Sequence, residues 1–393
     1  MKNRKTEYIL CTQSMPSEMV TSAYTATGKG FATMKKIFAI NLGSTSTKVA
    51  YYEDDKCIFK DSIDHPAEEL KDFNTVYEQK EAREAAILRY MENHDIDPGS
   101  LDAFVTRGGQ TEPVSGGVYR INEPMVEQAM SGRYGVHVCS VGSAIAFDFC
   151  RNRTALPLTV DTPATDELEP LARYSGLREV PRVSRFQALN HRAMAKYYSE
   201  SIGKRYQDLN LIVCMLGGGI TVAAHKKGSM IDGPDGLEGD GPFSNNRCCT
   251  APVGELVKLC YSGKYDLQGM LKHINGEAGL MSYLGTTDAR KLEKDIDNGD
   301  LHAQEVVDAM CYQTAKEIGA YATVLKGDVD AILLIGGMAK WNFVIEHITE
   351  RVKFIAPVVV LPGEREMESL CLSSYEALCG REEIKEFVPQ EAK

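Results

Sequence analysis

The sequence predicts an α/β protein built from two related halves. Strand-like apolar runs alternate with helical patterns along the chain, as in proteins whose helices cover sheets. In addition, the layout of apolar strand, glycine turn and return strand occurs twice, in 37–50 (IFAINLGSTSTKVA) and 211–225 (LIVCMLGGGITVAAH). Leu42-Gly43 and Leu216-Gly217 occupy the same place in each copy. We therefore interpret each copy as the opening hairpin of one half.

The elements follow in order. Residues 1–33 have few apolar runs and precede a second methionine, Met34, so they are expected to be a disordered extension. Residues 34–163 are predicted to form an N-terminal domain, completed by a helix at 366–385, and residues 164–365 a C-terminal domain. Strands are expected at 37–59, 101–105, 157–160, 211–225, 331–335 and 358–361. Helices are expected at 66–94, from 124, from about 141, and at 184–201, 252–262, 287–298, 301–326, after 337, and 366–378.

Composition limits the classes of function. The 393 residues are enough for two domains with cores, and 25% charged and 43% apolar residues are ordinary for a globular protein. The formal charge of −11 argues against a nucleic-acid partner, although a local basic pocket for a small anion stays open. The 11 cysteines include no C-x-x-C and one adjacent pair, Cys248-Cys249, which we expect to be inert. This usage, with no apolar run near ~20 residues, predicts no membrane span and a cytoplasmic location.

Three glycine turns stand at strand ends: Gly43, Gly217–Gly219 and Gly336-Gly337. Glycine lets backbone N–H groups converge on phosphate oxygens, although a glycine can equally serve only to make a hairpin turn. The stretch from Gly43 is not a P-loop, because it lacks the second glycine and has Val49 where Ser or Thr is required. Gly217-x-Gly219 is no dinucleotide fingerprint either, because a strand-like run follows it where a helix is needed.

Charged residues at strand ends are the other candidates. Arg107 and Arg247 lie in glycine-rich loops, where an arginine is either a solvated surface charge or a ligand for carboxylate and phosphate. Asp161 and Asp240 lie at strand–loop junctions, where carboxylates bind Mg²⁺ or simply cap turns. His137, just ahead of a helix, is either structural or functional.

Nine segments together resemble butyrate kinases, of the acetate kinase group in the actin-like, sugar-kinase-like ATPase superfamily. They are NLGSTSTK (41–48), TRGG (106–109), VDTPATDE (160–167), LGGGITVAAHKKG (216–228), GLEGDGPFS (236–244), APVGEL (251–256), LGTTDAR (284–290), LLIGGMA (333–339) and PGEREMESL (362–370). The resemblance extends from Met34 to about Gly380. It implies two related actin-like, ribonuclease-H-like domains with a nucleotide cleft between them. It also implies ATP/ADP and Mg²⁺ as cofactors, a short-chain carboxylate and its acyl phosphate as substrates, and a homodimer or larger homo-oligomer.

The resemblance also implies roles for single residues. Arg107 and Arg247 would bind the carboxylate and the transferring phosphoryl group, with Asp161 the essential acid near the metal and His137 an active-site histidine. Glu366, or else Glu368, would be the glutamate associated with Mg²⁺. The nucleotide would lie on these residues: Asn41, Gly217, Gly218, Gly219, Asp288, Arg290, Gly336 and Gly337.

Two positions depart from the family pattern. Gln187 stands where the family has a histidine that supports the transition state, and Cys248-Cys249 stands where it usually has Ser-Gly. The Gln187 amide can still donate a hydrogen bond without a charge, and His191, one helical turn later, is expected to compensate in part. Two alternatives therefore stay open: an acetate or propionate kinase of the same group, and a catalytically weak actin-like nucleotide-binding protein.

Overall fold

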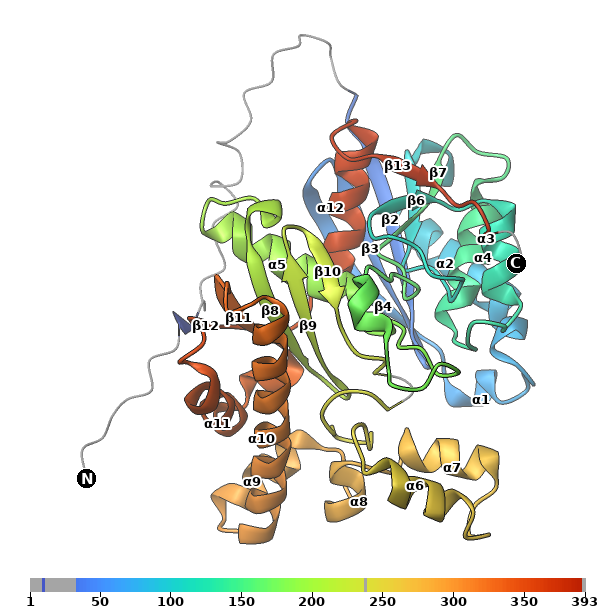
Figure 1. Cartoon of the computed structure of the whole chain (residues 1–393). Coiled ribbons are helices and arrows are strands. Elements are labelled where there is room, and N and C mark those ends of the chain that lie inside the picture. The colour runs from blue at the N-terminus through green and yellow to red at the C-terminus, as the bar shows by residue number, and fades with distance from the viewer. Residues whose placement is uncertain (1–8, 11–32, 237–238, 391–393) are drawn as a thin grey trace. The chain divides into compact units, whose positions relative to one another are not determined.

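The chain divides into two compact units. The computed structural model describes residues 9–10, 33–236 and 239–390 (Figure 1). The N-terminal unit holds residues 33–112, 117–160 and 367–390, and the C-terminal unit holds 113–116 and 161–366. The predicted disorder of residues 1–33 falls mostly outside the described residues. Within that stretch, Ile9–Leu10 form a two-residue strand, β1, beside β12.

The N-terminal unit contains a seven-stranded mixed sheet in the order β13-β6-β7-β5-β2-β3-β4. β2 and β3 form the first hairpin, and β4 extends it antiparallel, while β5 and β7 lie parallel to β2. The strands are β2 (Lys36–Leu42), β3 (Ser46–Glu53), β4 (Lys56–Asp64), β5 (Ala103–Thr106), β6 (Val118–Arg120), β7 (Leu156–Val160) and β13 (Ile384–Glu386).

The C-terminal unit contains a six-stranded mixed sheet in the order β1-β12-β11-β8-β9-β10. β8 and β9 form the second hairpin, β10 extends it antiparallel, and β11 and β12 lie parallel to β8. These strands are β8 (Asn210–Leu216), β9 (Ile220–Lys226), β10 (Ser229–Asp232), β11 (Ala331–Gly336) and β12 (Val358–Pro362).

The two sheets repeat one plan. The run β7-β5-β2-β3-β4 matches β12-β11-β8-β9-β10 in order, and the strand directions agree at every step. The prediction of an α/β fold with two related halves is therefore confirmed.

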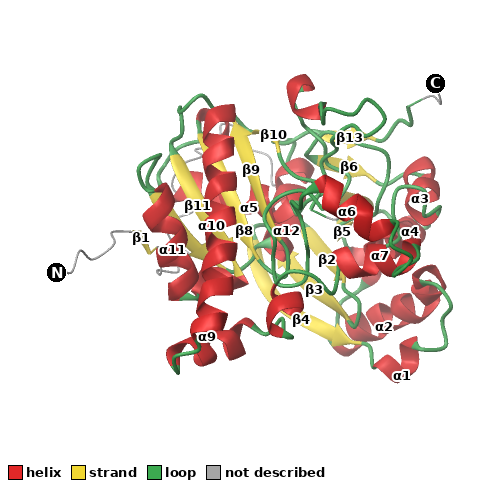
Figure 2. Cartoon of the chain, turned by 60° about the horizontal axis from the view of Figure 1, so that its bottom comes forward, coloured by secondary structure: helices red, strands yellow, loops and turns green. Residues whose placement is uncertain are grey.

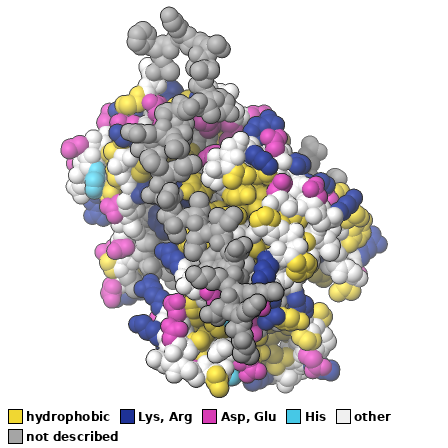
Figure 3. Space-filling view, turned by 90° about the vertical axis from the view of Figure 1, so that its left-hand side faces the viewer, with side chains coloured by type: hydrophobic (Ala, Val, Ile, Leu, Met, Phe, Trp, Pro, Cys, Tyr) yellow, Lys and Arg dark blue, Asp and Glu magenta, His cyan; other side chains and the backbone are white. Residues whose placement is uncertain are grey.

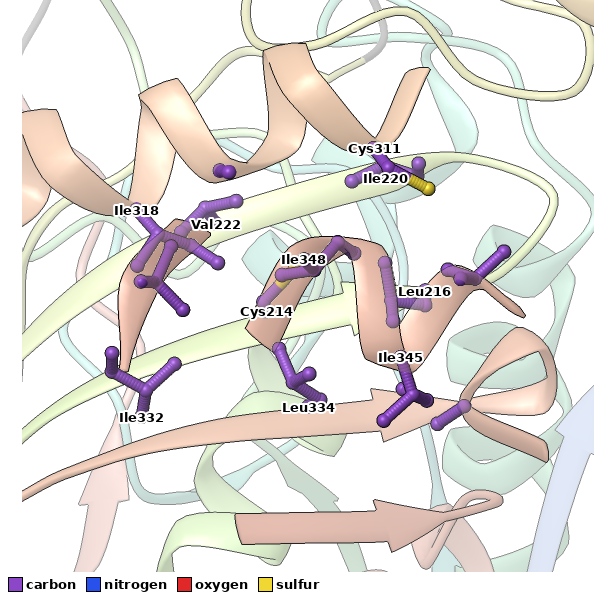
Figure 4. Close-up of a cluster of buried hydrophobic side chains, with 14 of the residues drawn as sticks. Cys214, Leu216, Ile220, Val222, Cys311, Ile318, Ile332, Leu334, Ile345 and Ile348 are labelled. Carbon is purple, nitrogen blue, oxygen red and sulfur yellow. The ribbon is translucent and has the colours of Figure 1, made fainter. Parts of the chain in front are cut away.

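Helices cover both faces of the C-terminal sheet. α10 (Leu301–Val324) and α11 (Asn342–Val352) pack on one face, where Cys311, Ile318 and Ile345 meet strand residues such as Cys214 and Leu334 (Figure 4). α5 (Ala188–Ser201) packs on the other face through Met194 and Ala195, against alternate residues of the same strands. Because both faces are covered, β8 and β11 are buried along their whole length, as their continuous apolar runs predict.

In the N-terminal unit, α4 (Cys139–Cys150) is the main covering helix and packs on β2, β5 and β7. Phe149 of α4 lies against Phe104 of β5, which stacks on Phe38 of β2. The remaining helices, seen in red in Figure 2, are α1 (Ala67–Leu70), α2 (Lys80–Asn93), α3 (Glu123–Met130), α6 (Val253–Cys260), α7 (Leu267–Ile274), α8 (Leu280–Leu284), α9 (Ala289–Asp297) and α12 (Glu366–Leu378). Short 3-10 helices are η1 (Val76–Gln79), η2 (Pro98–Ser100), η3 (Pro170–Arg173), η4 (Tyr206–Asp208) and η5 (Gly337–Lys340).

Three helix predictions were wrong in their bounds. The helix expected over 366–385 ends at Leu378, because the chain turns at Gly380, whose φ is +71°, and Ile384–Glu386 form β13 instead. The helix expected over 66–94 is split into α1, η1 and α2, because Glu78 accepts hydrogen bonds from the Asn74 backbone and the Thr75 hydroxyl and starts a new helix there. The helix expected from 184 begins at Ala188, because the Ser184 N–H and hydroxyl bond Asp166 and the Thr165 carbonyl instead of helical partners.

The surface charge, the cysteines and the helix lengths give three further observations. On the face shown in Figure 3, acidic and basic side chains are interspersed, so the formal charge of −11 is not gathered there into one acidic field. The cysteines within the described residues are all free thiols. Across the same residues, no helix combines the length and the apolar character that crossing a bilayer requires.

Candidate active site

Two of the predicted residues, Asn41 and Arg107, lie at one edge of the N-terminal sheet, and Asp161 is the first residue of the C-terminal unit after strand β7. β2, β5 and β7 are parallel neighbours, with Ile40 opposite Thr106 and Thr106 opposite Thr159. Asn41 lies at the carboxyl end of β2, and Arg107 and Asp161 directly follow β5 and β7. In open α/β sheets, ligands bind outside the carboxyl ends of the strands.

Asp161 is fixed by a buried arginine that the sequence did not reveal. The Asp161 side chain is buried, and its backbone has a φ of +41°, unusual for a residue with a side chain. Its Oδ1 lies 3.0 Å from Nε of Arg192, although the angle does not make an aligned hydrogen bond. The same guanidinium donates through Nη2 to both carboxylate oxygens of Glu167, at 2.8 Å each. Arg192 therefore ties Asp161 to α5 electrostatically.

The Arg192 cluster is tightly closed. Burial disfavours the charged form, but the carboxylates of Asp161 and Glu167 outweigh it and hold the pKa of Arg192 above its ordinary value. A Cβ on Gly116 would lie 2.1 Å from Nη2 of Arg192 and 2.8 Å from Oδ1 of Asp161. Only glycine fits there, so this short segment is shaped around the ion pair.

Arg107 and His137 lie in one electrostatic environment of the N-terminal unit. His137 accepts a hydrogen bond at Nδ1 from the Cys139 N–H, at 3.1 Å. Desolvation of the ring and then the charge of Arg107 lower the pKa of His137 from its ordinary value, although the residue as a whole is exposed. Gly109 allows this loop to approach α4, since a Cβ there would lie 2.7 Å from Cα of Ser140. The charge of Arg107 therefore acts against protonation of His137.

The two glycine turns of the C-terminal unit lie together. β8 and β11 are parallel neighbours, and a Cβ on Gly336 would lie 2.5 Å from the carbonyl oxygen of Leu216, the residue before Gly217. Gly336 also has a φ of +93°, which favours glycine. Gly337 and Gly218 have no neighbouring atom within 4 Å of a Cβ position. Their backbone therefore leaves room for a ligand at the carboxyl edge of the sheet.

Arg247 lies directly against the first of these turns. A Cβ on Gly219 would lie 2.5 Å from Nη1 of Arg247, and that Nη1 donates to the Gly236 carbonyl at 2.7 Å. Among the described residues, its buried Nε has no hydrogen-bond partner. Desolvation lowers the pKa of this guanidinium, while its ordinary value lies far above neutrality, so it stays charged. A half-buried arginine with an unused donor beside a glycine turn suits a phosphate or a carboxylate.

The predicted nucleotide residues Asp288 and Arg290 lie at the start of α9. Asp288 caps this helix, with Oδ1 accepting from the N–H groups of Arg290 and Lys291 at 3.0 and 3.4 Å. Asn245, two residues before Arg247, donates to the Thr287 carbonyl at 3.4 Å. The structure therefore connects the Asp288 segment to the Arg247 loop, and the side chains of Asp288 and Arg290 are exposed.

Gln187 stands at the N-cap position of α5 and contacts the return strand of the second hairpin. Its Oε1 accepts from Thr221 Oγ1 at 2.9 Å, and that hydroxyl lies 3.0 Å from Nε2 of His191. The expectation that His191 compensates in part for the missing histidine is wrong, because His191 is 0% exposed and desolvation lowers its pKa to about 3. A buried neutral ring cannot reach a ligand, and it instead supports Gln187 through Thr221.

The carboxylates offer no preformed metal cage. Within the described residues, no group of three or more His, Cys, Asp or Glu side chains is placed to hold a metal ion. Asp161 is engaged with Arg192, and Glu368 forms a 2.6 Å ion pair with Lys60. Glu366 is buried at the start of α12. Mg²⁺ commonly takes one or two carboxylates and completes its shell with phosphate oxygens and water, and this donor set fits that mode.

The structure connects some of the predicted residues through a chain of contacts and leaves others apart. Gln187, Gly217–Gly219, Arg247, Asp288 and Gly336 belong to one connected region of the C-terminal unit, while Arg107 and His137 form a second group. Asp240 pairs instead with Arg182, at 3.2 Å. Sequence reasoning missed Arg192 and also Arg83 of α2, two arginines on otherwise buried helix faces. A charged residue in an apolar helical stripe was the available signal.

Comparison with solved structures identifies the fold. Porphyromonas gingivalis acetate kinase matches with a TM-score of 0.71 at 18% identity, over 88% of this chain and 100% of that chain. Entamoeba histolytica acetate kinase matches with a TM-score of 0.66 at 15% identity, over 86% and 98%. A propionate kinase from Francisella tularensis subsp. tularensis SCHU S4 matches with a TM-score of 0.65 at 15% identity, over 86% and 99%. The chain thus has the two-sheet α/β fold seen in these kinases.

A sequence match is more specific. Residues 180–359 match the sequence model of the Acetokinase family. This stretch contains Gln187, the Gly217–Gly219 turn, Arg247, Asp288 and Gly336, so the family similarity coincides with the connected region of the C-terminal unit.

Proposed function

We propose that the protein transfers the γ-phosphoryl group of ATP to the carboxylate of a short-chain fatty acid, butyrate or a branched analogue, and catalyses the reverse reaction. The carrying observation is Arg247, charged and half-buried against the Gly219 turn, inside the segment that matches the Acetokinase family. The butyrate preference rests on the sequence resemblance alone.

The chemistry requires positive charge more than a base. An aliphatic carboxylate is ionised at neutral pH, so no proton has to be removed before it attacks phosphorus. The difficulty is to bring two anions together and to stabilise the charge on the transferring phosphoryl oxygens. Arg247 and Arg107 supply that charge in our proposal, and the Gln187 amide adds an uncharged donor, oriented by Thr221.

Asp161 acts as a positioning acid in this scheme. The Asp161 carboxylate is already engaged in a buried ion pair with Arg192. We therefore assign it to orienting the groups around it and not to direct coordination of the metal. Mg²⁺, when bound with ATP, neutralises phosphate charge, and Glu366 is the carboxylate that we assign to it. The turns at Gly217–Gly219 and Gly336-Gly337, with Asn41, Asp288 and Arg290, are assigned to the nucleotide.

A weak nucleotide-binding protein is the second candidate. The observation that favours it is Gln187, an uncharged residue where the resemblance implies a histidine. A hydroxamate assay with ATP and acetate, propionate, butyrate or isobutyrate separates the candidates. Turnover is expected to be highest with butyrate or isobutyrate. Highest turnover with acetate or propionate would assign the chain to those substrates, and no acyl phosphate from any acid would contradict the proposal.

The arginine itself gives the first prediction. Arg247→Ala should lower turnover by about 10³-fold or more, because transition-state arginines contribute on that order to phosphoryl transfer. Calorimetric binding of MgATP should change by less than about tenfold. Arg205→Ala, a change at an exposed arginine paired with Asp208, is the control and should turn over normally. Wild-type turnover in Arg247→Ala would remove Arg247 from the mechanism.

A further inference from the structure

Arg83 is a buried arginine that the proposed reaction does not use. It lies on α2 in a stripe with Ile87 and Met91, and it is 0% exposed. Buried arginines are usually paired with carboxylates, because an unpaired charge in the protein interior is costly.

All protein partners of Arg83 are uncharged within the described residues. Nε donates to Gln79 Oε1 at 3.0 Å, and Nη1 donates to Thr47 Oγ1 at 3.1 Å. Nη2 donates to the Ser44 carbonyl at 2.9 Å, and Nη1 also reaches the Ser46 carbonyl at 3.4 Å. Burial lowers the pKa of Arg83 to about 10, so the group is still charged at neutral pH. Each of its three nitrogens donates to an uncharged oxygen, but within the described residues its charge has no carboxylate partner.

These bonds fix the direction of the first hairpin turn. The Ser44 carbonyl faces Arg83, the Thr45 carbonyl accepts from the His65 N–H at 2.8 Å, and the Ser46 carbonyl accepts from the Gly43 N–H at 2.8 Å. In a trans peptide the carbonyl and the following N–H point in opposite directions, so the Thr45 N–H points away from Arg83. Ser44 and Thr45 are exposed, and no described residue accepts from their backbone N–H groups.

The turn therefore has a polarity. The carbonyl oxygens of Ser44 and Ser46 face the buried cation, while the Thr45 N–H points away from it on the exposed side of the turn. Outward N–H groups in a tight turn bind anions, and a buried positive charge behind them strengthens that attraction.

We propose that Arg83 is a positioning residue that holds the Ser44–Ser46 turn open to a phosphate group, and that the bound phosphate is the counter-ion of the buried guanidinium. This inference rests on the proposed function for the source of the phosphate, either ATP or the acyl phosphate. The anion site itself does not depend on the identity of the carboxylate.

Thermal unfolding of the full chain tests the anion site. Inorganic phosphate, MgATP and acetyl phosphate are each added to wild type, Arg83→Met, Arg83→Lys and the control Arg89→Met, which changes an exposed arginine of the same helix. Ligand binding raises the unfolding temperature in proportion to ln(1 + [L]/Kd). For at least one of the three anions, the increase in unfolding temperature should be nearly lost in Arg83→Met. The same increase should be largely kept in Arg83→Lys and unchanged in Arg89→Met. The anion whose effect Arg83→Met abolishes identifies the source of the phosphate.

Steady-state kinetics separate positioning from simple stability. Arg83→Met should raise KM for the affected anion by about tenfold, because one charged interaction is lost. Arg83→Lys should return KM most of the way to the wild-type value. A folded Arg83→Met protein with wild-type anion-induced shifts would overturn the proposal. If Arg83→Met does not fold, Arg83→Gln, which removes the charge but keeps polar atoms, is the second variant. A folded Arg83→Gln protein that has lost the anion-induced rise in unfolding temperature supports the site, and one that keeps the wild-type rise contradicts it. Direct anion binding is independent of carboxylate turnover, so failure of the proposed function would be seen separately in the hydroxamate assay.

Discussion

The two hairpin turns have the same place in the two sheets but use their arginines differently. In the first, Leu42 pairs with Thr47, and Arg83 lies beneath the turn, bonded to its carbonyls and 0% exposed. In the second, Leu216 pairs with Ile220, and Arg247 lies beside the turn, with one contact to the Gly236 carbonyl and a free Nε among the described residues.

The two arginines are therefore suited to different roles: Arg83 supports the turn, and Arg247 is placed to contact a ligand. Each nitrogen of Arg83 is hydrogen-bonded to the protein. We therefore expect Arg83 to act on an anion through its electrostatic field and through the shape that it gives the turn. Arg247 keeps a donor and a charged face, so it can contact a ligand directly. The duplicated hairpin thus has a turn supported by a bonded arginine in one half and a turn beside an arginine with an unused donor in the other.

The largest effect that tests this difference is expected at Gly219. Gly219→Ala places a Cβ 2.5 Å from Nη1 and 2.9 Å from the guanidinium carbon of Arg247. The clash is with the end of a flexible side chain, so Arg247 should move while the fold persists. Turnover should fall by about 10²-fold, since a misplacement of about 1 Å can cost that much. The unfolding temperature should change by less than about 2 °C.

Gly319→Ala is the control for that variant, because a Cβ in this position on α10 meets no atom within 4 Å. Full turnover in Gly219→Ala, with hydroxamate formation as the measurement, would mean that the position of Arg247 beside the turn is unimportant.

A second test uses the pH dependence of stability that the buried histidines of the two units are expected to cause. Desolvation and then Arg83 lower the pKa of His65, which bonds Thr47 beside the first turn. Desolvation also lowers the pKa of His191 to about 3 and that of His225 well below its ordinary value. The unfolded chain binds these protons first as pH falls. The stabilisation from the neutral rings is therefore complete above about pH 6.5 and is lost on acidification below it.

Each such histidine should contribute about 1.4 kcal/mol per pH unit to the slope of stability between its two pKa values. Urea unfolding at pH 7.5, 6.0 and 5.0 measures the slope. His191→Gln should reduce it, whereas His302→Gln, at an exposed histidine of α10, should leave it unchanged. An equal slope in wild type and His191→Gln would contradict this explanation.

The smallest effect is expected at Gly43, the counterpart in the first turn. A Cβ there would lie 3.3 Å from the Ser46 carbonyl oxygen, a tight contact that a shift of a few tenths of an ångström relieves. No arginine is touched, so Gly43→Ala should change turnover by less than about threefold, or under 1 kcal/mol. A loss as large as that in Gly219→Ala would show that ligand approaches Gly43 itself, and the two turns would then be equivalent.

Local signals in the sequence were sufficient for much of the fold. The hairpins, the Gly43 and Gly217–Gly219 turns and strands such as β11 could be read directly, because strand periodicity and glycine turns depend on neighbouring residues. The start of α5 could not be predicted from neighbouring residues, because the Ser184 hydroxyl donates to the carbonyl of Thr165, which lies far back in the chain. The candidate residues could be proposed one by one, but their contacts could not.

The sequence by itself determined the repeated strand–turn–strand plan, the two-part α/β class and the position of each glycine turn, since these follow from local chain chemistry. Tertiary structure alone decided that Arg247 lies against Gly219, that Arg192 holds Asp161 and that Arg83 lies under the first turn. Each of these contacts joins residues distant in sequence, because a buried charge takes its partners from whatever backbone and side chains the packing brings to it.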